Sequence, residues 1–504
     1  MAVPVWSVDP RTGKQREQVA VEATAEDVDA AVRAAAAAIP ALADRSVRSR
    51  LLRAAAGALE ESAADVVATA DAETALGAPR LTGELARTAY QLRAFADVVD
   101  EGAFLDVIID HADPAAQPIP RPDLRRMKIP LGVVAVYAAS NFPLAFSVPG
   151  GDTASALAAG CPVVVKAHPD HPATSALCAG LLRGAAESVG LPADTVVLLH
   201  GFQAGVELVR HPAVAAAGFT GSVPGGRALY DAAAARPQPI PFYGELGSLN
   251  PVVVTEAAAA ERAEQIGTGL AGSFTLGVGQ FCTKPGLVLA PAGSDGDRLV
   301  AALTGAADSA APGVLLDSRM RTNFLAGAAA RAALPGVSAP VAPAGEGETG
   351  VRPGFVTVPA AELTDLLLEE CFGPLTVVVR YGSAAELSAV LDRLPGNLTA
   401  TAHLGTAEAA EEDGPAATLL SRLTAVAGRV LVNGWPTGVA VAPAQHHGGP
   451  YPATTSTSTS VGATAIERWL RPVTYQDTPP ALLPAELRES NPLSLPRRVD
   501  GVRS

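Results

Sequence analysis

The sequence is poor in lysine, lacks long apolar runs and carries no dense basic cluster. Only four lysines occur among 504 residues, and the formal net charge is −14. Nucleic-acid backbones favour dense positive charge, so we expect no nucleic-acid partner. The longest apolar runs, such as residues 132–139, are too short to cross a bilayer. Residues 1–6 lack the basic and apolar segments of a signal peptide, which favours a cytoplasmic protein without a membrane partner.

Cysteine is also scarce, and its spacing excludes two common uses. The four cysteines, Cys161, Cys178, Cys282 and Cys371, are far apart and form no CxxC pair. A disulfide framework and a thiolate zinc site are therefore both disfavoured. We interpret Cys161, Cys178 and Cys371 as small buried apolar residues. Cys282 has different neighbours.

The composition that remains indicates a large folded protein. Hydrophobic residues make up 48% and charged residues 17%, which supports two or three packed units. Residues 25–110 have a helical pattern. Thr24 is a candidate cap for a first helix, and a second helix is expected from about Ser46, with an apolar face at helical spacing. The Pro-rich segment 112–126 is typical of a connector or an extended arm.

Residues 131–246 change to short apolar runs that alternate with Ala-rich helical stretches. The runs are Val133–Tyr137, Val163–Val165, Val196–Leu199 and Ala215–Phe219. This alternation predicts βαβ units and a parallel sheet. Asn141, Lys166 and Thr220–Gly221 each follow such a run, where open parallel sheets bind ligands.

A second α/β section is expected from about 250 to 435, followed by a low-complexity loop. Residues Gln445–Ser460 are rich in Gly, Pro, Ser and Thr, which is compatible with a flexible linker or with a functional loop. The tandem His446–His447 lies within it. No third metal ligand stands at a sensible spacing, so we interpret the pair as a loop element and expect no metal.

Cys282 follows the glycine-containing segment Gly277–Phe281. Small residues there allow the backbone and a ligand to approach the sulfur closely. A nucleophilic cysteine acts as a thiolate and needs polarising surroundings. Taken alone, such a cysteine is more often a buried structural residue than a nucleophile.

Three further segments carry groups that suit chemistry on a carbonyl carbon. Glu245 is an isolated acid in an apolar segment, where burial would raise its pKa and suit a general base, unless it is a solvated loop acid. Asn141 offers an amide donor for an oxyanion, or else a turn before Phe142–Pro143. Residues 218–227 predict a strand, a tight turn and a helix start that suits a pyrophosphate, although GxGxxG is absent.

Together and in this order, these four segments resemble the aldehyde dehydrogenase superfamily over about residues 8–480. Val164–Lys166, Glu369–Pro374 and Gly428–Asn433 match as well. The resemblance implies an α/β fold with a Rossmann-type cofactor domain, an α/β catalytic domain and a small oligomerisation arm. The boundaries expected are 1–112 and 130–246 for the cofactor domain, 247–440 for the catalytic domain, 113–129 and 465–480 for the arm, 441–464 for a substrate-entrance loop and 481–504 for a tail.

The resemblance also assigns roles. It implies that Cys282 is the nucleophile, Glu245 the general base and Asn141 the oxyanion amide, acting beside the Cys282 backbone N–H. The implied reaction proceeds through a hemithioacetal, hydride transfer and a thioester that Glu245-activated water hydrolyses. The implied cofactor-binding residues are Ser140, Lys166, His168, Gly221, Ser222, Gly226, Gly247, Glu370 and Phe372.

Within the superfamily, the chain is most similar to 2-oxoglutarate semialdehyde (2,5-dioxovalerate) dehydrogenases and NADP-dependent fatty-aldehyde dehydrogenases. The shared segments are 137–143, 166–169, 279–286 and 447–453. Relatives that prefer NAD often carry Glu three positions after the lysine, and here that residue is Pro169. We therefore expect NADP as the preferred cofactor and NAD as possible, since no carboxylate there repels a 2′-phosphate.

Several alternatives stay open at this point. A fatty-aldehyde dehydrogenase would differ only in the lining of its pocket. A CoA-acylating or reductive member is disfavoured by Glu245, which such relatives often lack. The family's assembly implies a homodimer or homotetramer, and the small-molecule partner is an aldehyde. No residue for a distal substrate carboxylate is identified.

Overall fold

The first half of the molecule is built on a five-stranded parallel sheet with the order β7-β6-β5-β8-β9. The computed structural model describes residues 3–503. The strands are β5 (Val133–Tyr137), β6 (Val163–Lys166), β7 (Val196–Leu199), β8 (Val214–Thr220) and β9 (Phe242–Glu245). The four apolar runs of the sequence are thus parallel strands, as predicted.

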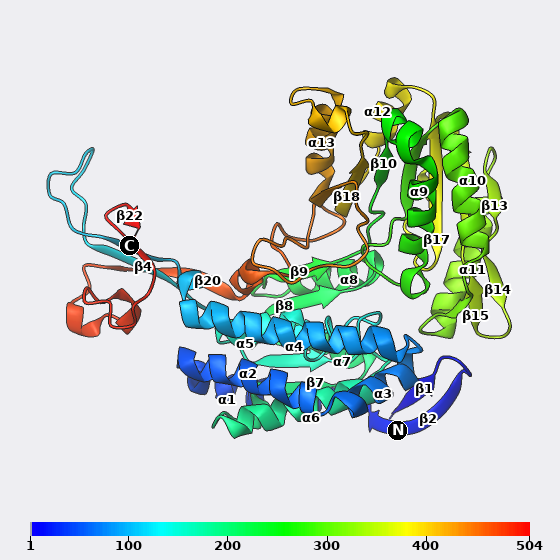
Figure 1. Ribbon diagram of the computed structural model, residues 1–504. Helices are drawn as coiled ribbons and strands as arrows, with labels where there is room; N and C mark the ends of the chain where they lie inside the picture. Colours follow the sequence, from blue (N-terminus) through cyan, green and yellow to red (C-terminus); the bar gives the residue numbers. More distant parts are fainter. Residues whose placement is uncertain (1–2, 504) are drawn as a thin grey trace.

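Helices cover both faces of this sheet (Figure 1). Val134 and Val136 of β5 pack into one core with α2 (Arg45–Glu61), α4 (Ala78–Glu101), α5 (Gly151–Ala159) and α6 (Pro172–Ser188). The alternate residues Val133 and Ala135 pack into a second core with α1 (Ala25–Ala38), α7 (Phe202–Arg210) and α8 (Val223–Ala234). Successive strand residues point to opposite faces, which is why a sheet buried on both sides is apolar throughout.

The helical prediction for residues 25–110 is largely confirmed and is wrong at its end. Thr24 caps α1 with a reciprocal capping box, and α3 (Ala63–Thr74) completes the helical set. Residues Val107–Asp110, however, form strand β3. Gly102 ends α4 in the left-handed conformation, and the β-branched run that follows pairs with another strand instead of continuing a helix.

The second half contains a seven-stranded sheet with the order β13-β16-β17-β11-β10-β18-β19, parallel except at β13. Its strands are β10 (Val252–Val254), β11 (Leu287–Pro291), β13 (Ser338–Val341), β16 (Gly354–Pro359), β17 (Leu375–Tyr381), β18 (Asn397–His403) and β19 (Ala427–Val432). One face packs on α9 (Glu256–Thr275) and α10 (Ser294–Asp308), and the other on α12 (Ala384–Leu391) and α13 (Pro415–Val426). Helix α11 (Ser318–Ala332) packs beside a small sheet of β12 (Gly313–Val314), β14 (Ala344–Glu346) and β15 (Gly350–Arg352).

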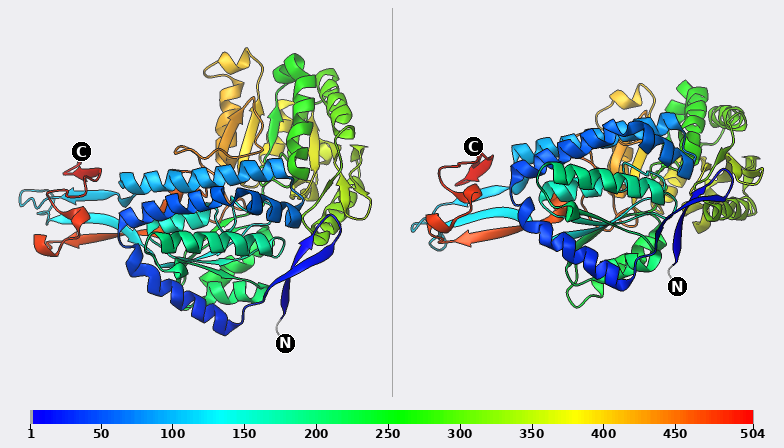
Figure 2. Two further views of the ribbon diagram at one scale, coloured as in Figure 1. Left: turned by 60° about the horizontal axis from the view of Figure 1, so that its bottom comes forward. Right: turned by 90° about the horizontal axis from the view of Figure 1, so that it is seen from below.

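An arm extends from one side of the molecule (Figure 2). It is a five-stranded sheet with the order β20-β4-β3-β21-β22. The strands are β3, β4 (Leu124–Pro130), β20 (Leu470–Gln476), β21 (Arg497–Val499) and β22 (Val502–Arg503). Two boundaries expected from the sequence are therefore displaced, because backbone pairing places β3 and part of the 481–504 tail in the arm sheet. At the other side, β1 (Pro4–Asp9) and β2 (Lys14–Val21) form a hairpin. No helix in residues 3–503 is both long and apolar enough to cross a membrane.

The carboxyl ends of the first sheet's strands face the amino ends of strands in the second sheet. Asn141, Lys166, Gly221 and Glu245 all lie at or just beyond the ends of β5, β6, β8 and β9. The chain passes from β9 into β10 of the second sheet through residues 246–251, and Cys282 lies just before β11. The fold therefore gathers the predicted site residues at the junction of its two halves.

A buried carboxylate supports the edge of this junction. Glu73 is fully buried, and its oxygens accept hydrogen bonds from the Ala173 N–H at 2.9 Å, the Thr174 N–H at 2.8 Å and the Thr174 hydroxyl at 2.7 Å. These donors lie in the first turn of α6, which has no side-chain cap of its own. We predict that Glu73→Ala costs about 1–3 kcal/mol and lowers the urea midpoint of unfolding. The exposed Glu61→Ala is the control, and equal midpoints would contradict this capping role.

Candidate active site

The segment before Cys282 has left-handed backbone at three consecutive residues. Gly277, Val278 and Gly279 have φ values of 56°, 59° and 66°. A Cβ on Gly279 would lie 2.4 Å from the backbone of Gly373, so a side chain there would separate the two segments. Gly279 therefore serves close packing against residues 373–374.

Asn250 fixes the same loop from the other side. Its side chain is fully buried, and Nδ2 donates to the carbonyl oxygens of Cys282 at 2.8 Å and Lys284 at 2.9 Å. The Thr399 hydroxyl donates to Asn250 Oδ1 at 2.9 Å. One amide from the crossover segment thus positions the cysteine backbone against the second sheet.

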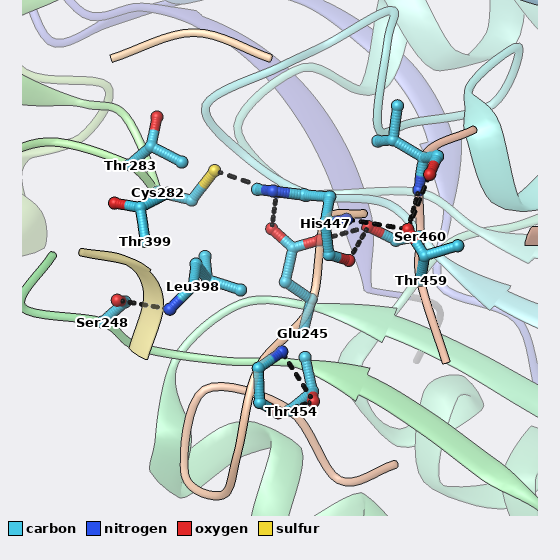
Figure 3. Close-up of polar contacts among 12 residues, drawn as sticks. Glu245, Ser248, Cys282, Thr283, Leu398, Thr399, His447, Thr454, Thr459 and Ser460 are labelled. Atoms are coloured by element: carbon cyan, nitrogen blue, oxygen red, sulfur yellow. Dashed lines mark hydrogen bonds and ion pairs between the residues drawn. The ribbon is translucent and has the colours of Figure 1, made fainter. Parts of the chain in front are cut away.

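Cys282, His447 and Glu245 form a continuous chain of contacts (Figure 3). Cys282 Sγ lies 3.6 Å from His447 Nε2, and the same nitrogen lies 2.8 Å from Glu245 Oε1. His447 and Glu245 are 1% and 3% exposed. A buried carboxylate linked to a sulfur through an imidazole is suited to moving protons at that sulfur.

The low-complexity loop supplies the remaining contacts. The Ser460 hydroxyl donates to Glu245 Oε2 at 2.7 Å, and the His447 N–H donates to Thr459 Oγ1 at 2.8 Å. Thr454 forms an antiparallel bridge with Glu245 at the edge of β9. Of the two alternatives for residues 445–460, the structure supports a functional loop, because its polar side chains hold Glu245 and His447.

The sequence analysis missed the place of His447. Nothing in its spacing links it to Glu245, which is 202 positions away, and its neighbours suggest only a loop. The similarity of segment 447–453 to relatives was the one available signal. The Nδ1 atom of His447 is buried without a hydrogen-bond partner among the described residues.

The rise predicted for the Glu245 pKa is wrong, because the pKa is lowered. Burial alone raises it, as the sequence suggested, but the charge and hydrogen bond of His447 and the hydrogen bond from Ser460 outweigh burial and leave the pKa below its ordinary value. Burial and the negative charge of Glu245 raise the pKa of the Cys282 thiol well above its usual range. The resting site therefore holds a carboxylate beside a neutral thiol.

Asn141 lies at the cysteine loop, as the oxyanion role requires. It is 8% exposed, and its Nδ2 donates to the carbonyl oxygen of Gln280 at 3.1 Å, two residues before Cys282. Arg80 Nη2 donates to the Asn141 carbonyl oxygen at 2.6 Å. The amide is thus aimed at the Cys282 loop from the end of β5.

A cavity of about 240 Å³ reaches Cys282 from the side of α4. Its walls include the rings of Phe142, Phe146 and Phe281, and two arginines, Arg80 and Arg87. Neither arginine was singled out from the sequence. Aromatic walls with a few polar groups are typical of a small-molecule site.

Three of the residues expected to hold a dinucleotide, Gly221, Ser222 and Gly226, lie at the start of α8. The turn Gly221–Ser222 is exposed at the start of α8, where Ser222 is the N-cap. A Cβ on Gly226 would lie 2.1 Å from Leu246, and one on Gly247 would lie 2.7 Å from Glu370 Oε2. Side chains therefore pack directly against the backbone of Gly226 and Gly247, where only glycine leaves room. The exposed start of α8 has the free N–H groups of a phosphate-binding turn.

Two further residues of that set, Lys166 and His168, are half-buried at and just after the end of β6. Burial lowers the pKa of Lys166, and burial with the neighbouring His171 lowers that of His168. Burial raises the pKa of Glu370 to about 7. Ser140 and Phe372 are half-buried, after β5 and before β17 respectively. The half-buried lysine and an acid with a pKa near 7 are compatible with the ribose contacts that the resemblance implies.

The other cysteines lie away from this chemistry. Cys161 and Cys178 are buried, and burial raises the pKa of each thiol, to about 11 for Cys161 and about 12 for Cys178. Cys371 is half-buried rather than buried as expected, and Lys284 Nζ donates to the carbonyl oxygens of Cys371 and Leu375. Ligand atoms of Glu245, Cys282 and His447 lie within 4.8 Å of one another, and their hydrogen bonds already account for that closeness.

Comparison with known proteins identifies the family. A model described as the aldehyde dehydrogenase family matches residues 4–471. The chain belongs to the aldehyde dehydrogenase family. This confirms the resemblance drawn from the sequence and, with it, the α/β fold class, and the family uses NAD(P).

Two curated relatives and one solved structure are informative. Alpha-ketoglutaric semialdehyde dehydrogenase 2 of Azospirillum brasilense is 50% identical and covers 90% of this chain and 88% of its own length. Alpha-ketoglutaric semialdehyde dehydrogenase of Acinetobacter baylyi is 45% identical and covers 85% and 82%. A 3,6-anhydro-L-galactose dehydrogenase in complex with NAP shares the fold, with a TM-score of 0.80, 23% identity and coverage of 94% and 96%.

The pKa shifts predict how this family member reacts with an alkylating agent. The thiolate is the reactive form, and the negative charge of Glu245 helps to hold the Cys282 pKa high, so iodoacetamide should react faster as pH rises. Glu245→Gln removes that charge, lowers the pKa and moves the profile to lower pH. A fall of about 1 in pKa gives about tenfold faster alkylation below the pKa.

Cys282→Ser measures the background from the other cysteines in this experiment. A Glu245→Gln profile that stays in place or moves to higher pH would contradict the electrostatic coupling of Glu245 to Cys282.

Proposed function

We propose that this enzyme oxidises 2,5-dioxovalerate, the semialdehyde of 2-oxoglutarate, to the acid with NAD(P). The contact chain from Cys282 through His447 to Glu245, at the end of an aromatic-walled cavity, carries the proposal for the reaction. The names of the two relatives that match most of the chain support the substrate.

The cofactor would be held by the residues around α8 and β6. Ser222 and the turn with Gly221 and Gly226 would receive the pyrophosphate, Lys166 with His168 and Ser140 the adenosine side, and Glu370 with Gly247 and Phe372 the nicotinamide side. When bound, NAD(P) supplies the acceptor for the hydride that leaves the aldehyde carbon.

In the first half-reaction, Cys282 attacks the aldehyde. The thiol proton leaves to solvent, and His447 Nε2, 3.6 Å from the sulfur, lies beside the sulfur anion as it forms. The new S–C bond makes the aldehyde oxygen an oxyanion, which takes hydrogen bonds from Asn141 Nδ2 and the Cys282 backbone N–H. Loss of hydride from that carbon leaves a thioester on Cys282.

In the second half-reaction, Glu245 activates water. Its carboxylate takes a proton from the water as the oxygen attacks the thioester carbon, and Cys282 departs as the thiolate. Ser460 and His447 keep the carboxylate in place through both steps. The products are the carboxylic acid, the reduced nicotinamide and one proton, with water consumed.

We propose NADP as the preferred nicotinamide cofactor. Pro169 stands where a carboxylate would repel a 2′-phosphate, and Lys166 is close by in the chain. The next residue, Asp170, has its side chain 7% exposed and 3.3 Å from His168 Nδ1, and burial raises its pKa to about 7. An acid that is largely buried and has a pKa of about 7 carries only part of its negative charge near neutral pH, so it repels a phosphate only weakly.

The arm is the surface that we propose for self-association into a homodimer or homotetramer. Its edge strands β20 and β22 expose backbone, and Val502 is 70% exposed and Leu482 is 73% exposed beside it. Exposed sheet edges with apolar side chains favour pairing with another chain. We also propose a cytoplasmic location for the protein.

A steady-state screen tests the substrate and the cofactor together. We expect the highest kcat/KM with 2,5-dioxovalerate, lower values with succinic semialdehyde and hexanal, and a better rate with NADP than with NAD, followed by absorbance of the reduced nicotinamide. Preference for a long-chain aldehyde would replace the semialdehyde with a fatty aldehyde. Cys282→Ser should abolish turnover, and a rate near wild type would overturn the mechanism.

Glu245→Gln separates the two half-reactions. The variant should still produce a burst of reduced cofactor, because the thioester can form, while steady turnover falls by about 10²- to 10⁴-fold for loss of a general base. Stopped-flow absorbance measures both phases. Loss of the burst with normal protein folding would contradict the assignment of Glu245 to deacylation.

A further inference from the structure

Two arginines of α4 face the cavity that ends at Cys282. Arg80 and Arg87 are two helical turns apart, and both line the cavity with Phe142, Phe146 and Cys282. Residues seven apart lie on one face of a helix. This face therefore places two permanent positive charges on the path that an aldehyde takes to the sulfur.

Arg80 is held in place but keeps unused donors. Its Nη2 donates to the Asn141 carbonyl oxygen, and its guanidinium carbon lies 4.6 Å from the Phe281 ring centroid and 5.1 Å from that of Phe142. Its Nε and Nη1 atoms are buried and have no hydrogen-bond partner in the part of the chain that the structure describes. The side chain is thus fixed between two aromatic rings with part of its donor set unsatisfied.

Arg87 is bound still more weakly by the protein. Nε donates to the Val439 carbonyl oxygen at 3.3 Å and Nη1 to Gln91 Oε1 at 3.4 Å, both long for hydrogen bonds. Nη2 is buried with no partner, and the guanidinium carbon lies 5.3 Å from the Phe146 ring centroid. A buried donor without a partner is costly, so these donors call for an acceptor.

The protein offers no anion that satisfies them. Within residues 3–503, neither arginine has a carboxylate oxygen within 4.0 Å. Glu84 lies between them on α4, but its Oε1 accepts from the Leu144 and Ala145 N–H groups at 2.8 and 2.9 Å. Burial raises the pKa of Glu84, which further weakens its compensation. The cavity side of α4 keeps an excess of positive charge.

We propose that Arg87, assisted by Arg80, binds the distal carboxylate of the substrate while the aldehyde end reaches Cys282. This rests on the proposed semialdehyde oxidation and names the residues that select an acidic aldehyde. Guanidinium groups bind carboxylates through paired, charge-assisted hydrogen bonds. The rings of Phe142 and Phe146 line the path between and suit the methylene groups of a short chain.

The test compares a charged with an uncharged aldehyde of equal carbon number, 2,5-dioxovalerate and pentanal. Arg87→Met should lower kcat/KM for 2,5-dioxovalerate by about 10- to 100-fold, mainly through KM, which corresponds to the loss of a charged hydrogen bond. The rate with pentanal should stay within about twofold. Arg93→Met, on the same helix outside the cavity and paired with Glu60, is the matched control and should change neither.

Equal losses for both aldehydes, or no loss for either, would overturn the proposal. Arg80→Lys keeps the charge but has fewer hydrogen-bond donors. It should lower kcat/KM for 2,5-dioxovalerate more than for pentanal. An equal effect on both aldehydes would remove Arg80 from the carboxylate site and leave it with the Asn141 loop alone.

A binding measurement separates this proposal from the proposed function. Titration of 2-oxoglutarate into Cys282→Ala protein by calorimetry should show binding that Arg87→Met weakens about 10-fold or more and Arg93→Met leaves unchanged. If binding depends on Arg87 but the wild-type enzyme oxidises no semialdehyde, the carboxylate site is supported and the proposed reaction is refuted. Binding insensitive to Arg87, with normal semialdehyde turnover, would do the reverse.

Discussion

The contact between Glu245 and His447 is the interaction on which the site depends. A carboxylate that is 3% exposed must be paired, because an isolated charge in the protein interior is strongly disfavoured. Its partners come from residues 447 and 460, in the loop that connects the second sheet back to the arm. The need to satisfy one acid therefore determines the path of a loop that has no regular structure, and it brings an imidazole to the cysteine.

The crossover between the two sheets is built in the same way. Asn397 Oδ1 accepts from the backbone N–H groups of Leu249 and Asn250, and Ser248 Oγ accepts from the Leu398 N–H. Asn250 then holds the Cys282 carbonyl oxygen. Three short polar side chains thus join the segment between β9 and β10 to β18 and to the cysteine loop, so that movement of either sheet would displace the sulfur. Fully satisfied buried networks of this kind rigidify a site.

Cys282 lies between two surroundings of opposite charge. Glu370, on the side of the expected cofactor, adds to the rise in the Cys282 pKa, while Arg87 on the other side carries a positive charge into the cavity. Glu245 and His447 lie close to the sulfur from the loop side. The charges around the sulfur therefore differ from one side to the other.

The sequence alone was sufficient for the local elements and for the family. Alternating apolar runs predicted the parallel strands, because strands buried on both faces must be apolar, and Thr24 predicted the start of α1 because its hydroxyl and Asp27 satisfy free amides there. Residues 107–110 were misassigned, since one of the two strands that pair with them, β21, is distant in the chain. Cys282, Glu245 and Asn141 could be named as candidates because each belongs to a recognisable local segment.

Tertiary structure decided what surrounds those three residues. His447 joins the site from 165 positions after Cys282, and Arg80 and Arg87 join it from a helix near the N-terminus. The shift in the Glu245 pKa differs in direction from the prediction for the same reason. Burial could be inferred from the apolar neighbours in the sequence, but the influence of His447 could not. Side-chain type and spacing report on near neighbours in the chain, whereas electrostatics and hydrogen bonding depend on neighbours in space.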